Sequence, residues 1–214
     1  MTTVIVLAKA PVPGRVKTRL SPPFTPAQAA RLAEAALADT LETVLSTASA
    51  NPVLALDGEP GAWLPPGLTV IPQITGGLDT RIAAAFAVAA ERSTGPALLI
   101  GMDTPQITPV LLTPDWTGAD ALLGPAHDGG FWALGFREPE PATVRRAVLG
   151  VPMSRHDTGP VQLARLRAAG LRTRLLPSAR DIDTAADARA VAPLCPPGSR
   201  FARLLYATAI SVHG

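Results

Sequence analysis

Strand-like and helix-like segments alternate along the first half of the chain, and this order restricts the fold more than any other feature. Strand-like runs of aliphatic and β-branched residues lie at 3–8, 52–56, 68–71 and 96–101, and Ala/Leu-rich segments with helical periodicity lie at 25–49 and 78–93. A βαβαβ order is typical of a parallel sheet covered by helices on both faces. We therefore predict an α/β protein with three αβα layers and a mostly parallel sheet.

The second half continues the sheet with more mixed segments. Strands are predicted at 119–124, 131–136 and 171–176, and helices at 142–149, at 158–169 and after Thr184. Thr25 and Thr184 each begin a capping box, which marks the start of a helix. We expect residues 1–192 to form one domain. An amphipathic tail within 193–214 is expected to be a helix packed on that domain.

Several classes of protein are excluded by composition. The longest stretch without Asp, Glu, Lys or Arg, residues 60–78, holds four prolines and four glycines, so no membrane span is predicted. The first residues have no basic segment before their apolar run, and the single cysteine, Cys195, has no partner for an internal disulfide. We expect a cytoplasmic protein.

Charge gives no support for nucleic-acid binding. The chain has 19 Lys and Arg against 17 Asp and Glu, the arginines are scattered, and only 4% of the residues are aromatic. A nucleic-acid surface normally needs a basic stripe, with aromatic residues to stack on unpaired bases. We expect no nucleic-acid partner.

The loop after the first strand is basic and framed by Pro and Gly. Arg15, Lys17 and Arg19 are three cations within five residues, and Gly14 precedes them. Alternate side chains of an extended loop share a side, so these cations can bind one di- or triphosphate. The alternative is a solvated basic loop. Neither of the two common glycine-rich phosphate motifs is present.

An aspartate follows the strand predicted at 96–101. Asp103 lies at the edge of the sheet where ligands of open α/β sheets bind, and Pro105 ends the segment. A carboxylate at this position is suited to Mg²⁺ or Mn²⁺, which bridges phosphate oxygens. The alternative is a turn aspartate without a ligand.

Three further segments have the residue types of a ligand site. Asp128 precedes two glycines between two strands, a pattern that also predicts an ordinary hairpin turn. The segment Asp181-Ile-Asp183-Thr184 offers carboxylates for a metal, although Asp and Thr also cap helices. Gln73 lies in a glycine-rich loop that ends at Gly77, where an amide is suited to the edge of a purine base.

These motifs together resemble one known family. The segment from Leu7 through Ala8 to Leu20 (LAKAPVPGRVKTRL), the later G-x-D-x-P at 101–105, G-P-A-x-D-G-G at 124–130 and D-I-D-T at 181–184 occur in the family's order. This is the GT-A-like transferase family once called a domain of unknown function and labelled an arsenosugar-biosynthesis or radical-SAM-associated glycosyltransferase. The resemblance covers residues 4 to about 192 and implies the nucleotide-diphospho-sugar transferase fold. Similar loops occur in molybdenum-cofactor and 2-phospholactate guanylyltransferases.

The resemblance also implies roles for individual residues. The first loop and the Gln–Gly loop would bind the nucleotide and its phosphates. The residues concerned are Ala8, Gly14, Arg15, Lys17, Arg19, Gln73 and Gly77. Asp103 matches the metal-binding aspartate of the D-x-D element, and Asp183 matches the late metal ligand. Catalysis would involve Lys17 and Asp103 on the departing diphosphate and Asp128 as the base.

The sequence departs from the family pattern at three points. Gly101 replaces the first carboxylate of D-x-D, Asp79 and Thr80 replace the usual Gly-Glu pair before Arg81, and His127 stands where an acid is common. Glycosyl transfer from a nucleotide-activated sugar to a small-molecule acceptor is the first prediction, with Mg²⁺ or Mn²⁺ as cofactor. The alternatives are a nucleotidyltransferase acting on a small phosphorylated acceptor and a nucleotide-binding module without turnover. A homodimer through the apolar tail is a further possibility.

Overall fold

The computed structural model describes residues 1–211, and it contains one seven-stranded sheet in the order β3-β2-β1-β4-β6-β5-β7. The strands are β1 (Thr2–Lys9), β2 (Ala50–Asp57), β3 (Thr69–Pro72), β4 (Ala97–Gly101), β5 (Ala121–Pro125), β6 (Phe131–Phe136) and β7 (Thr173–Leu175). All seven coincide with predicted strands, with ends that differ by up to two residues.

The sheet is mostly parallel, as predicted. β1 pairs in parallel with β2 and β4, β2 with β3, and β5 with β7. β6 runs against both of its neighbours, β4 and β5. The reversal arises because only a short turn joins β5 to β6, and a short turn can connect antiparallel strands but not parallel ones.

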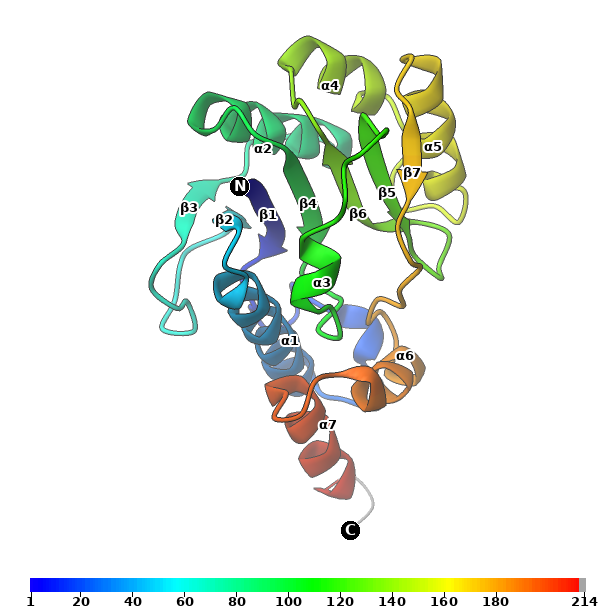
Figure 1. Ribbon diagram of the computed structural model, residues 1–214. Coiled ribbons are helices and arrows are strands. Elements are labelled where there is room, and N and C mark those ends of the chain that lie inside the picture. Colours follow the sequence, from blue (N-terminus) through cyan, green and yellow to red (C-terminus); the bar gives the residue numbers. More distant parts are fainter. Residues whose placement is uncertain (212–214) are drawn as a thin grey trace.

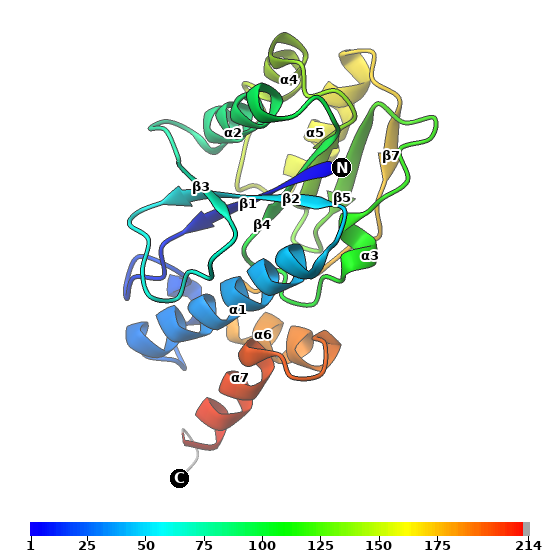
Figure 2. The same cartoon turned by 60° about the vertical axis from the view of Figure 1, so that its left-hand side comes forward.

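Helices cover both faces of the sheet (Figures 1 and 2). One face carries α2 (Leu78–Arg92), α4 (Pro141–Val148) and α5 (Thr158–Ala168), and the other carries α1 (Pro26–Ser46) and the short α3 (Pro109–Leu112). α6 (Ala185–Val191) and α7 (Arg200–Ser211) lie beyond α1, away from the sheet. The predicted α/β class with three αβα layers is confirmed.

The strands divide their side chains between two cores. In β1, Val4 and Val6 belong to the core beneath α1, whereas Ile5 belongs to the core beneath α2 and α4. This division follows from the period of two along a strand. On the α2 side, Phe86 and Phe136 meet edge to face with their ring centroids 4.9 Å apart. Both cores therefore hold the carboxyl ends of β1 and β4 in fixed positions.

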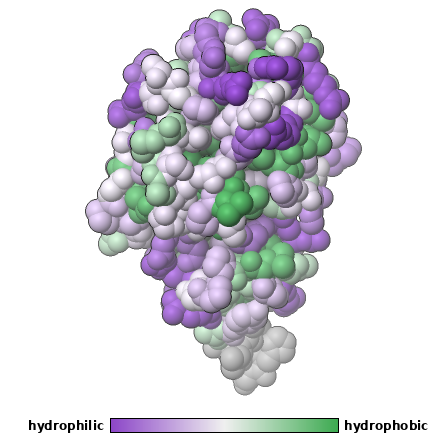
Figure 3. Space-filling view, in the orientation of Figure 1, coloured by the Kyte–Doolittle hydropathy of each residue, from purple (hydrophilic) through white to green (hydrophobic). Residues whose placement is uncertain are grey.

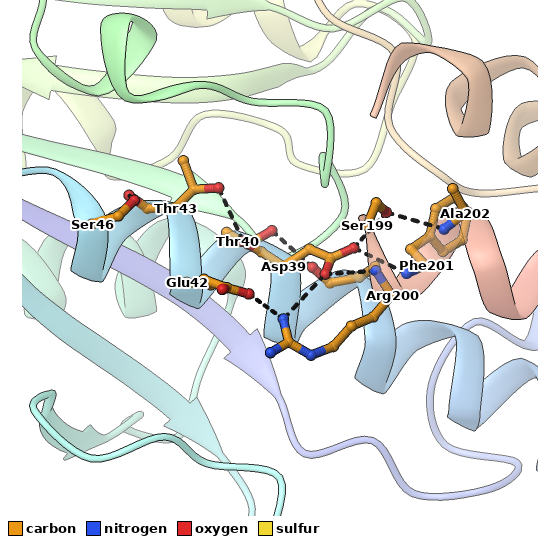
Figure 4. Close-up of polar contacts among 10 residues, drawn as sticks. Asp39, Thr40, Glu42, Thr43, Ser46, Ser199, Arg200, Phe201 and Ala202 are labelled. Carbon is orange, nitrogen blue, oxygen red and sulfur yellow. Dashed lines mark hydrogen bonds and ion pairs between the residues drawn. The ribbon is translucent and has the colours of Figure 1, made fainter. Parts of the chain in front are cut away.

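A buried carboxylate of α1 binds the beginning of α7. Asp39 Oδ1 accepts a hydrogen bond from the Arg200 amide, and its Oδ2 accepts from the Phe201 amide and the Ser199 hydroxyl, over 2.9, 2.9 and 2.6 Å (Figure 4). Arg200 also pairs with Glu42 of α1. The exposed N–H groups of a helix start need such acceptors. Asp39 therefore fastens the C-terminal helix to α1.

The predicted helix boundaries hold to within three residues, and both predicted capping boxes are present. Sequence analysis missed three short elements, namely α3 and the 3-10 helices η1 (Thr18–Leu20) and η2 (Ala192–Leu194). The last residues of the predicted tail, 212–214, lie outside the described residues. Apolar side chains gather over α3 in Figure 3, where Val110 is 79% exposed. Within residues 1–211, no helix is long and apolar enough to cross a membrane.

Candidate functional site

A cleft of about 690 Å³ opens at the carboxyl ends of β1 and β4 and beside the turn between β5 and β6. It is lined by residues from all the segments that sequence analysis selected, including Arg15, Lys17, Arg19, Gln73, Asp103, Asp128 and Asp183. Ala8 lines it as well, whereas Gly14 and Gly77 are not among its lining residues. The basic loop and the acidic residues therefore share one cavity.

Lys17 lies at the centre of the charged part of the cleft. Its Nζ is 2.8 Å from Asp103 Oδ2 and 3.1 Å from Asp183 Oδ1, and its side chain is only 9% exposed. The backbone of Lys17 has a φ of 51°, in the left-handed region, where the loop turns into η1. Burial alone would lower the pKa of Lys17, but the two carboxylates outweigh it and raise that pKa. Lys17 is therefore a fixed positive charge.

The two carboxylates beside Lys17 differ in what else they contact. The second oxygen of Asp183 is 3.2 Å from Arg19, whose side chain is 74% exposed. The second oxygen of Asp103 is buried and has no hydrogen-bond partner among residues 1–211. An acceptor of this kind normally has a partner, so Asp103 retains capacity for a ligand.

Asp183 also belongs to a group of three carboxylates with Asp128 and Asp181. One oxygen from each of the three lies within 4.8 Å of the others. We call this group the acidic triad. Burial, and then the charges of Asp128 and Asp183, raise the pKa of Asp181 to about 6. Oxygen ligands at this spacing suit a hard divalent cation, which would relieve the repulsion among them.

The metal pair of Asp103 and Asp183 stays a prediction, and the structure adds two further carboxylates beside Asp183. It groups Asp183 with Asp128 and Asp181 and gives Asp103 an ion pair with Lys17. Sequence analysis found carboxylates for a metal in the segment 181–184 but named only Asp183 as a ligand, although Asp181 lies two residues before it. Alternate residues of an extended segment share a side.

The hairpin interpretation of Asp128 is correct, and the same turn lines the cleft. Asp128 Oδ1 accepts a hydrogen bond from the Gly130 amide over 2.7 Å. Gly129 lies against the segment before α5, where a Cβ atom would stand 1.8 Å from the carbonyl oxygen of His156. A glycine is thus required for this close approach.

The amide of Gln73 is engaged within the protein. Its Nε2 donates hydrogen bonds of 2.8 Å to the carbonyls of Ala8 and Ala55, and its Oε1 accepts from Arg81 over 2.9 Å. Arg81 in turn lies 3.3 Å from Asp57. Contact between Gln73 and a base stays a prediction. Arg81, which sequence analysis did not select, lines the cleft beside Gln73.

The other end of the cleft is formed by the segment between α4 and α5. Met153, Arg155 and His156 line it opposite Phe131. Asp79 at the start of α2 accepts a hydrogen bond of 2.8 Å from the Gly150 amide and so anchors the beginning of this segment. Sequence analysis identified none of these residues as part of the site, because nothing local distinguishes this segment from an ordinary loop.

A family model matches residues 31–155, more than half of the chain, and is described as "uncharacterized protein conserved in bacteria (DUF2064)". The chain belongs to this family. The match includes Gln73, Asp103 and Asp128, whereas the basic loop and Asp183 lie outside it. No curated protein matches the sequence of this DUF2064 member.

Solved structures share the fold. A proposed nucleotide-diphospho-sugar transferase from Desulfovibrio desulfuricans G20 aligns with a TM-score of 0.87 at 24% identity, over 99% of this chain and 96% of its own. A cytidylyltransferase from Leptospira borgpetersenii aligns with a TM-score of 0.55 at 12% identity, over 99% and 95%. A CMP:2-keto-3-deoxy-manno-octonic acid synthetase complexed with CTP aligns with a TM-score of 0.53 at 14% identity. The alignment covers 89% of this chain and 96% of the synthetase. This DUF2064 chain has the fold of nucleotide-diphospho-sugar transferases and cytidylyltransferases.

Proposed function

We propose that this DUF2064 protein is a metal-dependent transferase that uses a nucleotide-activated donor, and that the group transferred is a sugar. One observation carries the proposal: three cations of one loop and four carboxylates line the same cleft at the carboxyl edge of the sheet. Cations and carboxylates in one cleft fit a diphosphate together with a divalent cation. The likeness of the fold to a proposed nucleotide-diphospho-sugar transferase supports this choice.

The basic loop would bind the diphosphate of the donor. Arg15 and Arg19 place guanidinium groups at the cleft, and Lys17 adds a buried ammonium. Charge that develops on the leaving nucleoside diphosphate would be stabilised by these cations. Gln73, which directly follows β3, and Arg81 of α2 would receive the nucleoside end of the donor.

The residues of the acidic triad fit a divalent cation. Asp128, Asp181 and Asp183 would hold Mg²⁺ or Mn²⁺, and burial together with the charges of Asp128 and Asp183 raises the pKa of Asp181 to about 6. When bound, the ion would neutralise phosphate charge. The acceptor would enter from the side of Phe131 and His156. We assign Asp128 as the general base of the acceptor, through the carboxylate oxygen that does not hold the ion.

Nucleotidyl transfer is the second candidate. The three cations of the basic loop favour it, because a nucleoside triphosphate carries more negative charge than a nucleoside diphosphate sugar. The likeness in fold to cytidylyltransferases is consistent with this reaction. Nucleotide binding without turnover stays a third alternative. The assignment to arsenosugar or radical-SAM chemistry and the homodimer stay predictions.

Product analysis tests the proposal. Nucleoside triphosphates and nucleoside diphosphate sugars are first screened for thermal stabilisation with Mn²⁺, since a ligand of the folded state raises the melting temperature. Donors that bind are then incubated with the protein, and the products are separated by anion exchange. Release of a nucleoside diphosphate supports sugar transfer, and release of pyrophosphate supports nucleotidyl transfer.

Two variants complete this test. Asp183→Asn should abolish turnover, whereas Asp115→Asn, which changes a carboxylate outside the cleft lining, should retain it. Tight, metal-independent nucleotide binding with no product from any donor would leave only the binding module.

A further inference from the structure

Asp183 belongs to both charged groups of the cleft. As a member of the acidic triad it lies with Asp128 and Asp181, and its two oxygens also contact Lys17 at 3.1 Å and Arg19 at 3.2 Å. Both oxygens of a proposed metal ligand therefore already lie beside cations of the chain. A divalent cation at the triad has to compete with at least one of them, because cations that share a carboxylate repel one another.

Lys17 is better placed than Arg19 for this competition. The ammonium of Lys17 is buried and also lies 2.8 Å from Asp103, which has a second, buried oxygen without a partner among residues 1–211. After losing Asp183, the ammonium would still have Asp103 as a counter-ion, so the exchange would not leave a buried charge unpaired. Arg19 is largely exposed, and a contact in solvent contributes little to binding.

We propose that Lys17 is the cation that neutralises Asp183 in the metal site when no metal ion is bound. Its contact with Asp183 and the binding of a divalent cation to that carboxylate exclude one another, and metal binding frees the ammonium to turn toward the donor diphosphate. The last step rests on the proposed function. The exchange between the ammonium and the metal rests only on the proposed metal site, not on the donor or the group transferred.

Manganese titration followed by electron paramagnetic resonance tests the exchange without a donor. Lys17→Met removes the ammonium but keeps a long side chain, and we expect it to tighten Mn²⁺ binding at least about tenfold, the value of one charge-assisted hydrogen bond. Lys9→Met is the matched control. Lys9 also lines the cleft but has no ion pair within the described part of the chain, so its loss should change the affinity by no more than about threefold.

Several outcomes would overturn the proposal. Equal affinity of the Lys17→Met and Lys9→Met proteins for Mn²⁺ would do so, as would weaker binding by Lys17→Met or failure of both the natural protein and Lys17→Met to bind. A larger gain in Arg19→Gln than in Lys17→Met would show that Arg19 is the cation displaced.

A measurement on the unaltered protein covers the case in which Lys17→Met does not fold. The chain contains two lysines, so two side-chain signals are expected after selective ¹³C labelling of lysine. Saturation with Mg²⁺ should shift the Lys17 Cε signal and leave that of Lys9 nearly unchanged. An unmoved Lys17 signal at saturation would contradict the exchange. A protein that passes both tests but turns over no donor would refute the proposed function alone.

Discussion

At the scale of single residues, opposite charges lie closer together in this cleft than their sequence positions suggest. Lys17, Asp103 and Asp183 lie more than 70 residues apart in the chain, yet one ammonium contacts both carboxylates. In the acidic triad, burial and then the charges of Asp128 and Asp183 raise the pKa of Asp181 to about 6. The cleft therefore contains two charged groups that share Asp183.

The raised pKa of Asp181 has a consequence for stability. The unfolded carboxyl titrates near 3.8 and the folded one near 6, so the folded protein holds this proton more firmly. The cost of burying the charged form is absent below pH 3.8 and fully present above pH 6. In EDTA, Asp181→Asn should therefore raise the melting temperature at pH 7.5 and change it little at pH 3.8. An increase of the same size at both pH values would contradict the assignment.

The site residues differ in how far sequence alone could predict them. Lys17, Arg19 and Asp103 belong to motifs whose residue types already indicate a phosphate and metal site, and the structure places them in one cleft. His156 was missed because its segment has no local signature, and Arg81 was noted only as the end of a motif that departs from the family pattern. The ion pair of Lys17 with Asp103 depends on distances across the fold, which spacing in the sequence does not contain.

At the scale of secondary structure, local patterns predicted the elements well. Strand composition and capping boxes located all seven strands and the six longer helices. The short α3 was missed because four residues give no periodicity. The direction of β6 depended on recognising that the Asp128 turn is too short for a crossover. The connection between α1 and α7 had no local signal, because it depends on one buried carboxylate.

That connection can be tested through Asp39. Asp39→Ala should lower the free energy of unfolding by about 1–3 kcal/mol, because two amides and one hydroxyl lose a charged acceptor in a buried place. Glu42→Gln is the control, since Glu42 contacts the same Arg200 but is 65% exposed. Urea unfolding followed by circular dichroism measures both. Equal losses would show that Asp39 contributes no more than a surface ion pair.

At the scale of the whole molecule, the cleft is assembled from two parts of the fold. The β1, β3 and β4 ends supply the basic loop, Gln73 and Asp103, while the β5–β6 turn and the segment before α5 supply the opposite wall. The Gly159 amide donates a hydrogen bond of 2.8 Å to the Gly129 carbonyl, which joins the β5–β6 turn to the beginning of α5. The relative position of the two walls therefore depends on core packing as well as on the loops.

Gly129 provides a test of this assembly. Gly129→Ala places a methyl group against the His156 carbonyl at a φ of 90°, and we expect it to destabilise the fold by more than about 2 kcal/mol. Gly150→Ala is the matched control, because its φ is 76° but no atom lies within 4 Å of the added carbon, so its cost should stay near 1 kcal/mol. Thermal unfolding compares the two. A smaller effect at Gly129 would mean that the β5–β6 turn and the segment before α5 can move apart to accommodate the methyl group.

The reversed strand β6 also bears on how such a cleft can vary during evolution. A tight turn between two paired strands cannot lengthen freely, because an added residue displaces the register or bulges the ladder. The linker at 149–157 joins two helices and has no ladder to preserve. Insertions and replacements that alter the shape of the cleft among related proteins should therefore accumulate in that linker, while the neighbouring turn stays constant in length.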